Sequence, residues 1–271
     1  MYVSGISALS RNYFSNNGNF ILMFHGVSKQ KVPLVPKDLQ PHLNVNEFEF
    51  IIRWLSKRFN FISIKEAIKE NKNGILLTFD DGFNNNYTNV YPVLKKYKIP
   101  GLFFVSTQHI IDQKNWLGFI QKSNNHKYLK KDLSKENKSE FYDGISKKNL
   151  KTMASDHLIT IGSHTISHPK LTTLSSKKVF FELEKSKTFL EELTGESIYA
   201  FAYPFGNYDK RVISLVKEAG YKFAFGTDVI NNHGNDSFEI PRIGIYSHHK
   251  AYLSAKLSGL YLKPIKLSTL S

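Results

Sequence analysis

The chain has 271 residues, of which 41% are hydrophobic and 14% aromatic, enough to bury one substantial core and to exclude a largely disordered protein. It has no cysteine, which excludes disulfides, thiolate metal sites and cysteine nucleophiles, so any metal must be bound by His, Asp or Glu. The formal net charge of +14 predicts a surface that attracts anions or simply keeps the protein soluble, and scattered lysines without a basic motif argue against nucleic acid.

Short apolar runs alternate with amphipathic stretches along the chain, which is typical of repeated βα units. We predict strands at residues 20–24, 59–63, 74–79, 101–106, 158–162, 198–203 and 221–225. Helices are predicted at residues 45–57, 64–70, 87–97, 175–193 and 210–219. This order predicts an α/β fold, a distorted or incomplete (β/α) barrel of about seven βα units.

One main domain is expected over residues 20–248, between two terminal segments. Residues 1–19 form a polar extension that lacks the apolar core of a secretion signal, so we expect a cytoplasmic protein. Lys-rich residues 113–151 interrupt the βα rhythm, either as a lid or as a tolerated surface insertion. Residues 249–271 form a C-terminal helix or tail, whose apolar stripe either packs on the barrel or makes peripheral contact with an anionic membrane.

Two adjacent carboxylates follow the strand predicted at residues 74–79, namely Asp80 and Asp81, with Gly82 behind them. Sites in α/β folds are built at the carboxyl ends of strands. A turn there lets the two side chains diverge, so that one can bind a cation while the other handles a proton. An aspartyl-phosphate enzyme is the alternative, but it would leave the histidines described next without a role.

A second polar cluster follows the strand predicted at residues 158–162 and contains His164 and His168. Two histidines four residues apart can converge on one cation if the segment between them turns tightly. Together with Asp81 they would form a three-ligand site that leaves positions open for water and substrate. Two imidazoles favour zinc over calcium or magnesium, while cobalt, nickel, manganese or iron could substitute.

The motifs at residues 78–82 (TFDDG) and 164–168 (HTISH) resemble the first two motifs of the polysaccharide deacetylase family, the NodB-homology domain of carbohydrate esterase family 4. The resemblance runs from about residue 20 to residue 245. A third motif is matched at residues 201–206, although Ala202 stands where many relatives carry arginine. That departure, and an early strand ending in His25, is similar to the poly-N-acetylglucosamine deacetylase branch.

The resemblance implies a hydrolase that removes N-acetyl groups from the amino sugars of a polysaccharide or glycan precursor. It implies that Asp80 is the general base and that Asp81, His164 and His168 bind the metal. The backbone N–H of Phe205 would stabilise the oxyanion. A catalytically lapsed glycan-binding module of the same fold is the alternative function.

The catalytic acid has two candidates under the same resemblance. The branch-specific histidine is His25, and its rival is His248, which stands where many relatives place a Leu-x-His motif. Arg242 could supply the cation missing at Ala202 and orient Asp80, or it could be an ordinary surface arginine. The expected substrate is an N-acetylated glycan, and the basic surface would suit one that bears phosphates or a lipid link.

Overall fold

The computed structural model describes residues 19–31, 40–69, 73–113, 134–227 and 236–258. Most of the predicted N-terminal extension therefore lies outside the described residues. The same is true of residues 114–133 in the Lys-rich segment and of the tail from residue 259 onward. Among the described helices, none is both long and apolar enough to cross a bilayer.

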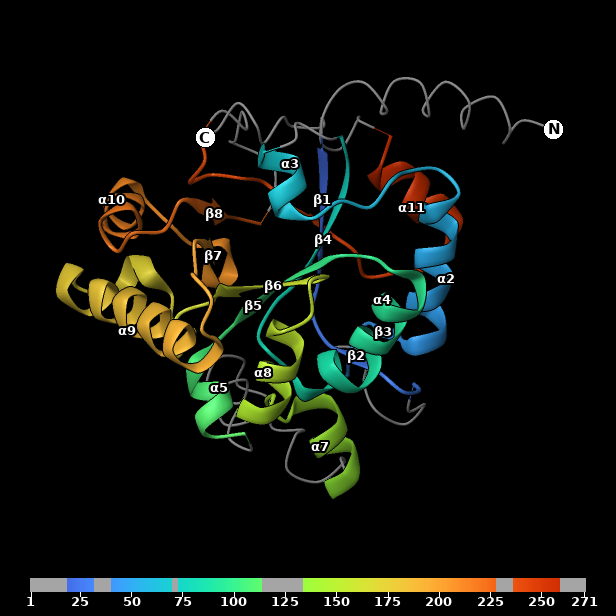
Figure 1. The fold of residues 1–271 in the computed structure, drawn as a ribbon, viewed down its shortest axis with the longest axis horizontal. Helices are drawn as coiled ribbons and strands as arrows, with labels where there is room; N and C mark the ends of the chain where they lie inside the picture. The colour runs from blue at the N-terminus through green and yellow to red at the C-terminus, as the bar shows by residue number, and fades with distance from the viewer. Residues whose placement is uncertain (1–18, 32–39, 70–72, 114–133, 228–235, 259–271) are drawn as a thin grey trace.

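Seven parallel strands form the central sheet, in the spatial order β8-β7-β6-β5-β4-β1-β9 (Figure 1). They are β1 (Asn19–Phe24), β4 (Gly74–Phe79), β5 (Gly101–Val105), β6 (Ile159–Ser163), β7 (Ala200–Ala202), β8 (Phe223–Phe225) and β9 (Ile243–Gly244). The longest register joins β1 to β4, from Asn19 opposite Gly74 to Phe24 opposite Phe79. All carboxyl ends therefore lie at the same edge of the sheet.

One short segment contacts the outer strand β8 at one end of this order and pairs with β1 at the other. Ile240 makes a parallel bridge to Phe225 in β8, and three residues later β9 pairs with Leu22 and Met23 of β1. Residues 240–244 thus connect the two edges, and the sheet curls around them. The predicted distorted or incomplete barrel is confirmed.

Side chains alternate between the two faces of the curled sheet, as the pleat of a strand requires. One face carries Phe20, Leu22 and Phe24 of β1, which belong to a large core shared with the helices. The other face carries Ile21 of β1 and Phe104 of β5, in a smaller core built from most of the strands together with Ile240. By the same alternation, Thr78 and Asp80 turn toward the smaller, inner core.

Most helices cover the outer face of the sheet, whereas the short helix that carries Ile64 and Ala67 packs in the inner core. In Figure 1, α9 and α10 lie on one side of the central strands, and α2 and α11 lie on the other. The helices are α2 (Val45–Ser56), α3 (Ile64–Lys69), α4 (Tyr91–Tyr97), α5 (Thr107–Ile111), α7 (Lys135–Tyr142), α8 (Lys147–Ala154), α9 (Ser176–Thr194), α10 (Lys210–Glu218) and α11 (Lys250–Lys256). Shorter elements are η2 (Asn86–Val90), η4 (Leu171–Thr173), η5 (Pro204–Gly206) and the paired strands β2 (Val27–Ser28) and β3 (Leu43–Asn44).

Local sequence signals explain several helix boundaries. Asn44 and Glu47 form a reciprocal capping box at the start of α2. Asp209 caps α10 by accepting a hydrogen bond from the backbone N–H of Val212 at 2.8 Å. Gly195 ends α9 in a left-handed conformation. All five predicted helices are present, although the one predicted at residues 87–97 begins with the π-helical turn η2.

The strand predicted at residues 59–63 is wrong. Only Phe61 pairs there, through a single bridge to Ile75 at the start of β4. The chain then enters α3 at Ile64, and β5 pairs with β4 only from Thr78 onward. Residues 60–62 therefore lie beside the first residues of β4, along the part of its edge that β5 does not reach. Because α3 begins at Ile64, the pairing there stays limited to a single bridge.

Candidate metal centre and active site

The two sequence motifs converge at the carboxyl edge of the sheet. Asp80 and Asp81 follow β4 directly, and His164 follows β6. Asp81 has a left-handed backbone with φ of 76°, which turns its side chain away from the alternation that Asp80 obeys. This explains how two adjacent carboxylates face different partners in one site.

Three buried side chains meet at one point, namely those of Asp81, His164 and His168. Their ligand atoms all lie within 4.8 Å of one another. The Nε2 atoms of His164 and His168 lie 3.6 and 3.5 Å from the same carboxylate oxygen of Asp81. The structure thus brings together the three residues that the sequence proposed as metal ligands.

The ring orientation of His164 is set by a backbone contact. Its Nδ1 donates to the carbonyl oxygen of Ala202 at 2.7 Å. In the neutral ring the Nε2 lone pair then faces Asp81 and His168. An outer hydrogen bond that fixes the tautomer in this way is the usual support of a metal-binding histidine.

The loop that carries His168 has a strained backbone, which hydrogen bonds to α9 hold in place. Thr165 and His168 both have positive φ angles, 71° and 54°. The carboxylate of Glu182 on α9 accepts hydrogen bonds from the backbone N–H groups of Ile166 and Ser167, at 2.8 and 2.9 Å. Left-handed backbone at ordinary residues costs about 1–2 kcal/mol each and persists where the surroundings fix it, commonly at functional sites.

Burial shapes the protonation of this cluster. It raises the pKa of Asp81 well above its usual range, and the charge of Asp80 acts in the same direction. Burial also lowers the pKa of His164 to about 4 and that of His168 well below its usual range, against the opposing charge of Asp80. Both imidazoles are therefore neutral near pH 7. Two neutral imidazoles and one carboxylate form a donor set that fits a divalent cation.

Asp80 has a different environment, because it is paired with a buried arginine. Both carboxylate oxygens accept from Arg242, at 2.6 and 2.7 Å. Arg242 is fully buried and also donates to the Gly226 carbonyl. Burial would raise the pKa of Asp80, but the charge of Arg242 and its hydrogen bonds outweigh it and lower that pKa to about 2. The alternative that Arg242 is a surface residue is wrong.

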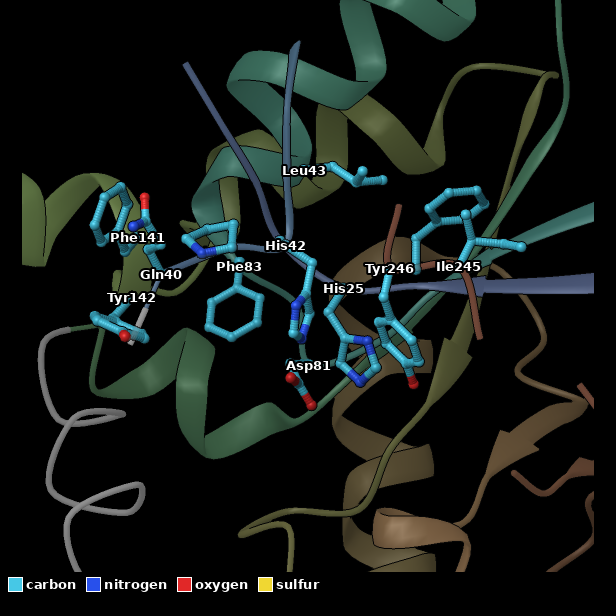
Figure 2. Close-up of a pocket in the computed structure, with 13 residues that line it drawn as sticks. His25, Gln40, His42, Leu43, Asp81, Phe83, Phe141, Tyr142, Ile245 and Tyr246 are labelled. Carbon is cyan, nitrogen blue, oxygen red and sulfur yellow. The ribbon is translucent and has the colours of Figure 1, made fainter. Parts of the chain in front are cut away.

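A cavity of about 370 Å³ opens beside Asp81. Figure 2 shows its lining, with His25, His42 and Tyr246 near the carboxylate of Asp81. Burial lowers the pKa of His25, although the charge of Asp80 acts in the opposite direction. His25 thus lines the cavity, within range of the charge of Asp80.

The other two predicted site residues lie apart from each other. His248 is half-buried against α2, where its Nδ1 lies 3.2 Å from a carboxylate oxygen of Glu47. Phe205 has a left-handed backbone with φ of 59°, and its ring centroid lies 4.5 Å from that of His168. The ring of Phe205 therefore borders the metal centre, whereas His248 contacts Glu47 and Phe50 of α2 and the ring of His249.

Sequence reasoning missed several residues of this site. Glu182 and His42 lie outside any motif, and Tyr246, which stands at the leucine position of the Leu-x-His motif, had no predicted role of its own. His109 was also missed, although it follows β5 at the same edge of the sheet as the catalytic motifs. Its place after a strand end was a usable signal, but a lone histidine without a spaced partner is more often structural.

Comparison with known proteins gives a consistent result. The profile of the polysaccharide deacetylase family matches residues 67–224, more than half of the chain. Poly-β-1,6-N-acetyl-D-glucosamine N-deacetylase of Staphylococcus aureus is 29% identical, over 95% of this chain and 85% of that protein.

Solved structures share the fold. IcaB from Ammonifex degensii superposes with a TM-score of 0.66 at 20% identity, covering 90% of this chain and 98% of that one. A polysaccharide deacetylase from Bacillus cereus gives 0.65 at 21% identity, covering 88% of this chain and 68% of that one. At these identities the likeness is one of fold.

Proposed function

Because this chain belongs to the polysaccharide deacetylase family, we propose that it removes N-acetyl groups from a polymer of N-acetylglucosamine through a divalent metal and an aspartate base. The observation that carries this proposal is the convergence of Asp81, His164 and His168 beside Asp80. The substrate class is supported by the similarity to the staphylococcal poly-β-1,6-N-acetyl-D-glucosamine N-deacetylase. A phosphate-bearing or lipid-linked glycan, and contact with an anionic membrane, are further proposals that rest on the net charge of +14.

The metal would be held by Asp81, His164 and His168, with zinc as the first choice and cobalt, nickel, manganese or iron as substitutes. When bound, such a cation would lower the pKa of water from near 16 toward about 7 and polarise the acetamide carbonyl. The neutral imidazoles suit this role, because a protonated ring cannot bind a cation.

Asp80 would accept the proton of the attacking water. Its pairing with Arg242 keeps the carboxylate ionised and fixes its orientation through two hydrogen bonds. A carboxylate with a low pKa is by itself a weak base, so it depends on an acidified water nearby. Arg242 would therefore act on Asp80 as a positioning residue.

The oxyanion and the leaving amine need one donor each. We propose the backbone N–H of Phe205 for the oxyanion, next to His168, where loss of one donor costs about 3 kcal/mol of barrier. The amine would be protonated by His25, which adjoins the cavity beside Asp81. His248 remains the rival acid, and its contacts with Glu47 on α2 favour His25 over it.

Acetate release from oligomers of β-1,6-linked N-acetylglucosamine, with and without chelator, tests this function. Asp80→Asn should retain bound zinc and lose about 10²–10⁴-fold in turnover, as expected for loss of a general base. His164→Ala should lose both zinc and turnover. Full turnover by Asp80→Asn would refute the base, and zinc binding without acetate release by the unmodified chain would indicate a glycan-binding module.

The two acid candidates are separated by a matched pair of variants. His25→Ala should lower turnover strongly across the pH range, whereas His248→Ala, which loses contacts to α2 and His249, should stay close to the unmodified chain. The opposite result would assign the acid to His248.

A further inference from the structure

His109 on α5 lies directly behind the metal turn. It is 2% exposed, and each ring nitrogen faces a backbone carbonyl. Its Nδ1 lies 3.0 Å from the carbonyl oxygen of Asp81, and its Nε2 lies 3.0 Å from that of Tyr142. One imidazole therefore connects the backbone of a metal-ligand residue to the last residue of α7.

Residues 142–145, which begin with the last residue of α7, are hydrogen-bonded to the same turn. The backbone N–H of Ile145 donates to Gly82 at 2.9 Å, and that of Asn84 donates to Asp143 at 2.7 Å. Gly144 pairs with Phe83 in an antiparallel bridge. The 142–145 segment thus clamps the chain just after Asp81.

The packing between His109 and this segment leaves no space. A Cβ atom on Gly144 would lie 1.9 Å from the backbone oxygen of His109, so only glycine permits the close approach. The ring of Phe83 packs edge-on against the His109 ring, with centroids 5.3 Å apart. His109 is therefore fixed from two sides and cannot turn away from its two carbonyl contacts.

The same segment continues into the wall of the cavity. Phe141 and Tyr142 line it on one side, while Asp81 and His25 line it as well (Figure 2). A displacement of the 142–145 segment would therefore change the cavity wall and the metal turn together.

We propose that His109 is a positioning residue that donates its Nδ1–H to the Asp81 carbonyl and so holds Asp81 in the left-handed conformation that cation binding requires. This inference rests on the proposed function, in which Asp81 is a metal ligand. Left-handed backbone at an aspartate costs about 1–2 kcal/mol, so an external hydrogen bond is needed to keep it rigid. The carbonyl of Tyr142 ends a helix, where water commonly substitutes as donor.

The proton assignment makes the proposal sharply testable. A carbonyl only accepts, and a neutral imidazole has one N–H, so either tautomer donates to just one of the two carbonyls. In His109→Asn the amide nitrogen replaces Nδ1 and can still donate to Asp81. In His109→Gln the amide nitrogen replaces Nε2 and can donate only toward Tyr142.

The dissociation constant of zinc, measured by competition with a chromogenic chelator, should separate these variants. His109→Asn should bind zinc within about threefold of the unmodified chain, whereas His109→Gln should bind about 10–100-fold more weakly, the usual effect of losing an outer hydrogen bond at a metal site. With cobalt in place of zinc, the visible absorption spectrum should change in His109→Gln and be retained in His109→Asn.

Tyr91→Phe is the matched control for loss of a hydrogen bond away from the site. The Tyr91 hydroxyl donates to a carboxylate oxygen of Asp156 at 2.7 Å, near the amino end of β6. This variant should lose stability without a change in zinc affinity. Equal zinc affinity in both His109 variants, or tighter binding by His109→Gln, would overturn the inference. Absence of zinc binding by the unmodified chain would instead refute the proposed function.

Discussion

At the scale of single residues, the pair of Asp80 and Arg242 is the contact on which the proposed base depends. The two side chains are buried and share two short hydrogen bonds. Removing one member of a buried ion pair leaves the other charge uncompensated, which typically costs about 3–5 kcal/mol.

Arg242→Ala should therefore lower the free energy of unfolding by about that amount and abolish turnover. Arg242→Lys should keep the charge but lose the two-point contact, and so retain stability better than turnover. Arg211→Ala is the control, because Arg211 forms a half-exposed pair with Asp209 at 3.8 Å, which is expected to contribute under about 1 kcal/mol. Urea denaturation measures the loss of stability, and kcat measures the loss of turnover. Equal losses in Arg211→Ala and Arg242→Ala would contradict both expectations.

The buried histidines predict how the metal-free protein responds to acid. The ordinary pKa of His164 is 6.5, and burial lowers it to about 4 in the folded chain. Between these values the unfolded chain takes up a proton that the folded chain does not, so the stability present above pH 6.5 falls as the pH drops toward 4. The loss attributable to His164 is about 3 kcal/mol at most.

His164→Gln removes this titration. In the presence of chelator, the difference in unfolding free energy between His164→Gln and the unmodified chain should change between pH 7 and pH 4.5. A difference that stays constant over this range would show that His164 is not held neutral in the folded protein.

At the scale of elements, the strands that carry the motifs were predictable and the supports around them were not. The strand at residues 74–79 was predicted with its true limits, because a buried apolar run ends there at charged residues and a glycine. The helices α7 and α8 lie in Lys-rich sequence with few apolar residues, and no periodicity indicated them. Their packing is tertiary, since α7 contacts β2 and α8 contacts β6 and α9, and local pattern cannot show such contacts between distant segments.

The turn after Asp81 gives a prediction at this scale, because Gly82 and Gly195 are both left-handed but differ in their surroundings. A Cβ on Gly82 would lie 2.6 Å from a methyl group of Val105, whereas one on Gly195 would meet nothing within 4 Å. Gly195→Ala should lower the free energy of unfolding by only about 1–2 kcal/mol, the cost of left-handed backbone at alanine. Gly82→Ala should lose more stability than Gly195→Ala and should also weaken zinc binding, because the turn must shift to make room for the Cβ atom. Thermal denaturation and zinc titration of the two variants check this, and equal losses would mean that the turn is not tightly packed.

At the scale of the whole molecule, the curled sheet brings Arg242 to Asp80 from 162 residues away in the chain. The βα alternation predicted the fold class, and the rule for carboxyl strand ends predicted which residues meet. Neither could predict that residues 240–244 connect β8 to β1, since β9 has only two residues and gives no pattern. The position of Arg242 inside the sheet follows from that closure, which depends on the complete set of strands.

Metal binding should also stabilise the whole chain. A ligand that binds only the folded state adds about 2.7 kcal/mol when present at 100 times its dissociation constant. For a domain of this size that corresponds to a rise in melting temperature of roughly 5–10 °C. Zinc should produce this rise in the unmodified chain and chelator should reverse it.

The number of zinc ions bound per chain, measured by native mass spectrometry, tests most directly whether Asp81, His164 and His168 form one metal site. We expect one zinc ion in the unmodified chain and in Asp80→Asn, and none in Asp81→Ala, His164→Ala or His168→Ala. Zinc retained at full occupancy after loss of any one of these three ligands would contradict the assignment, as would a folded, unmodified chain that binds none.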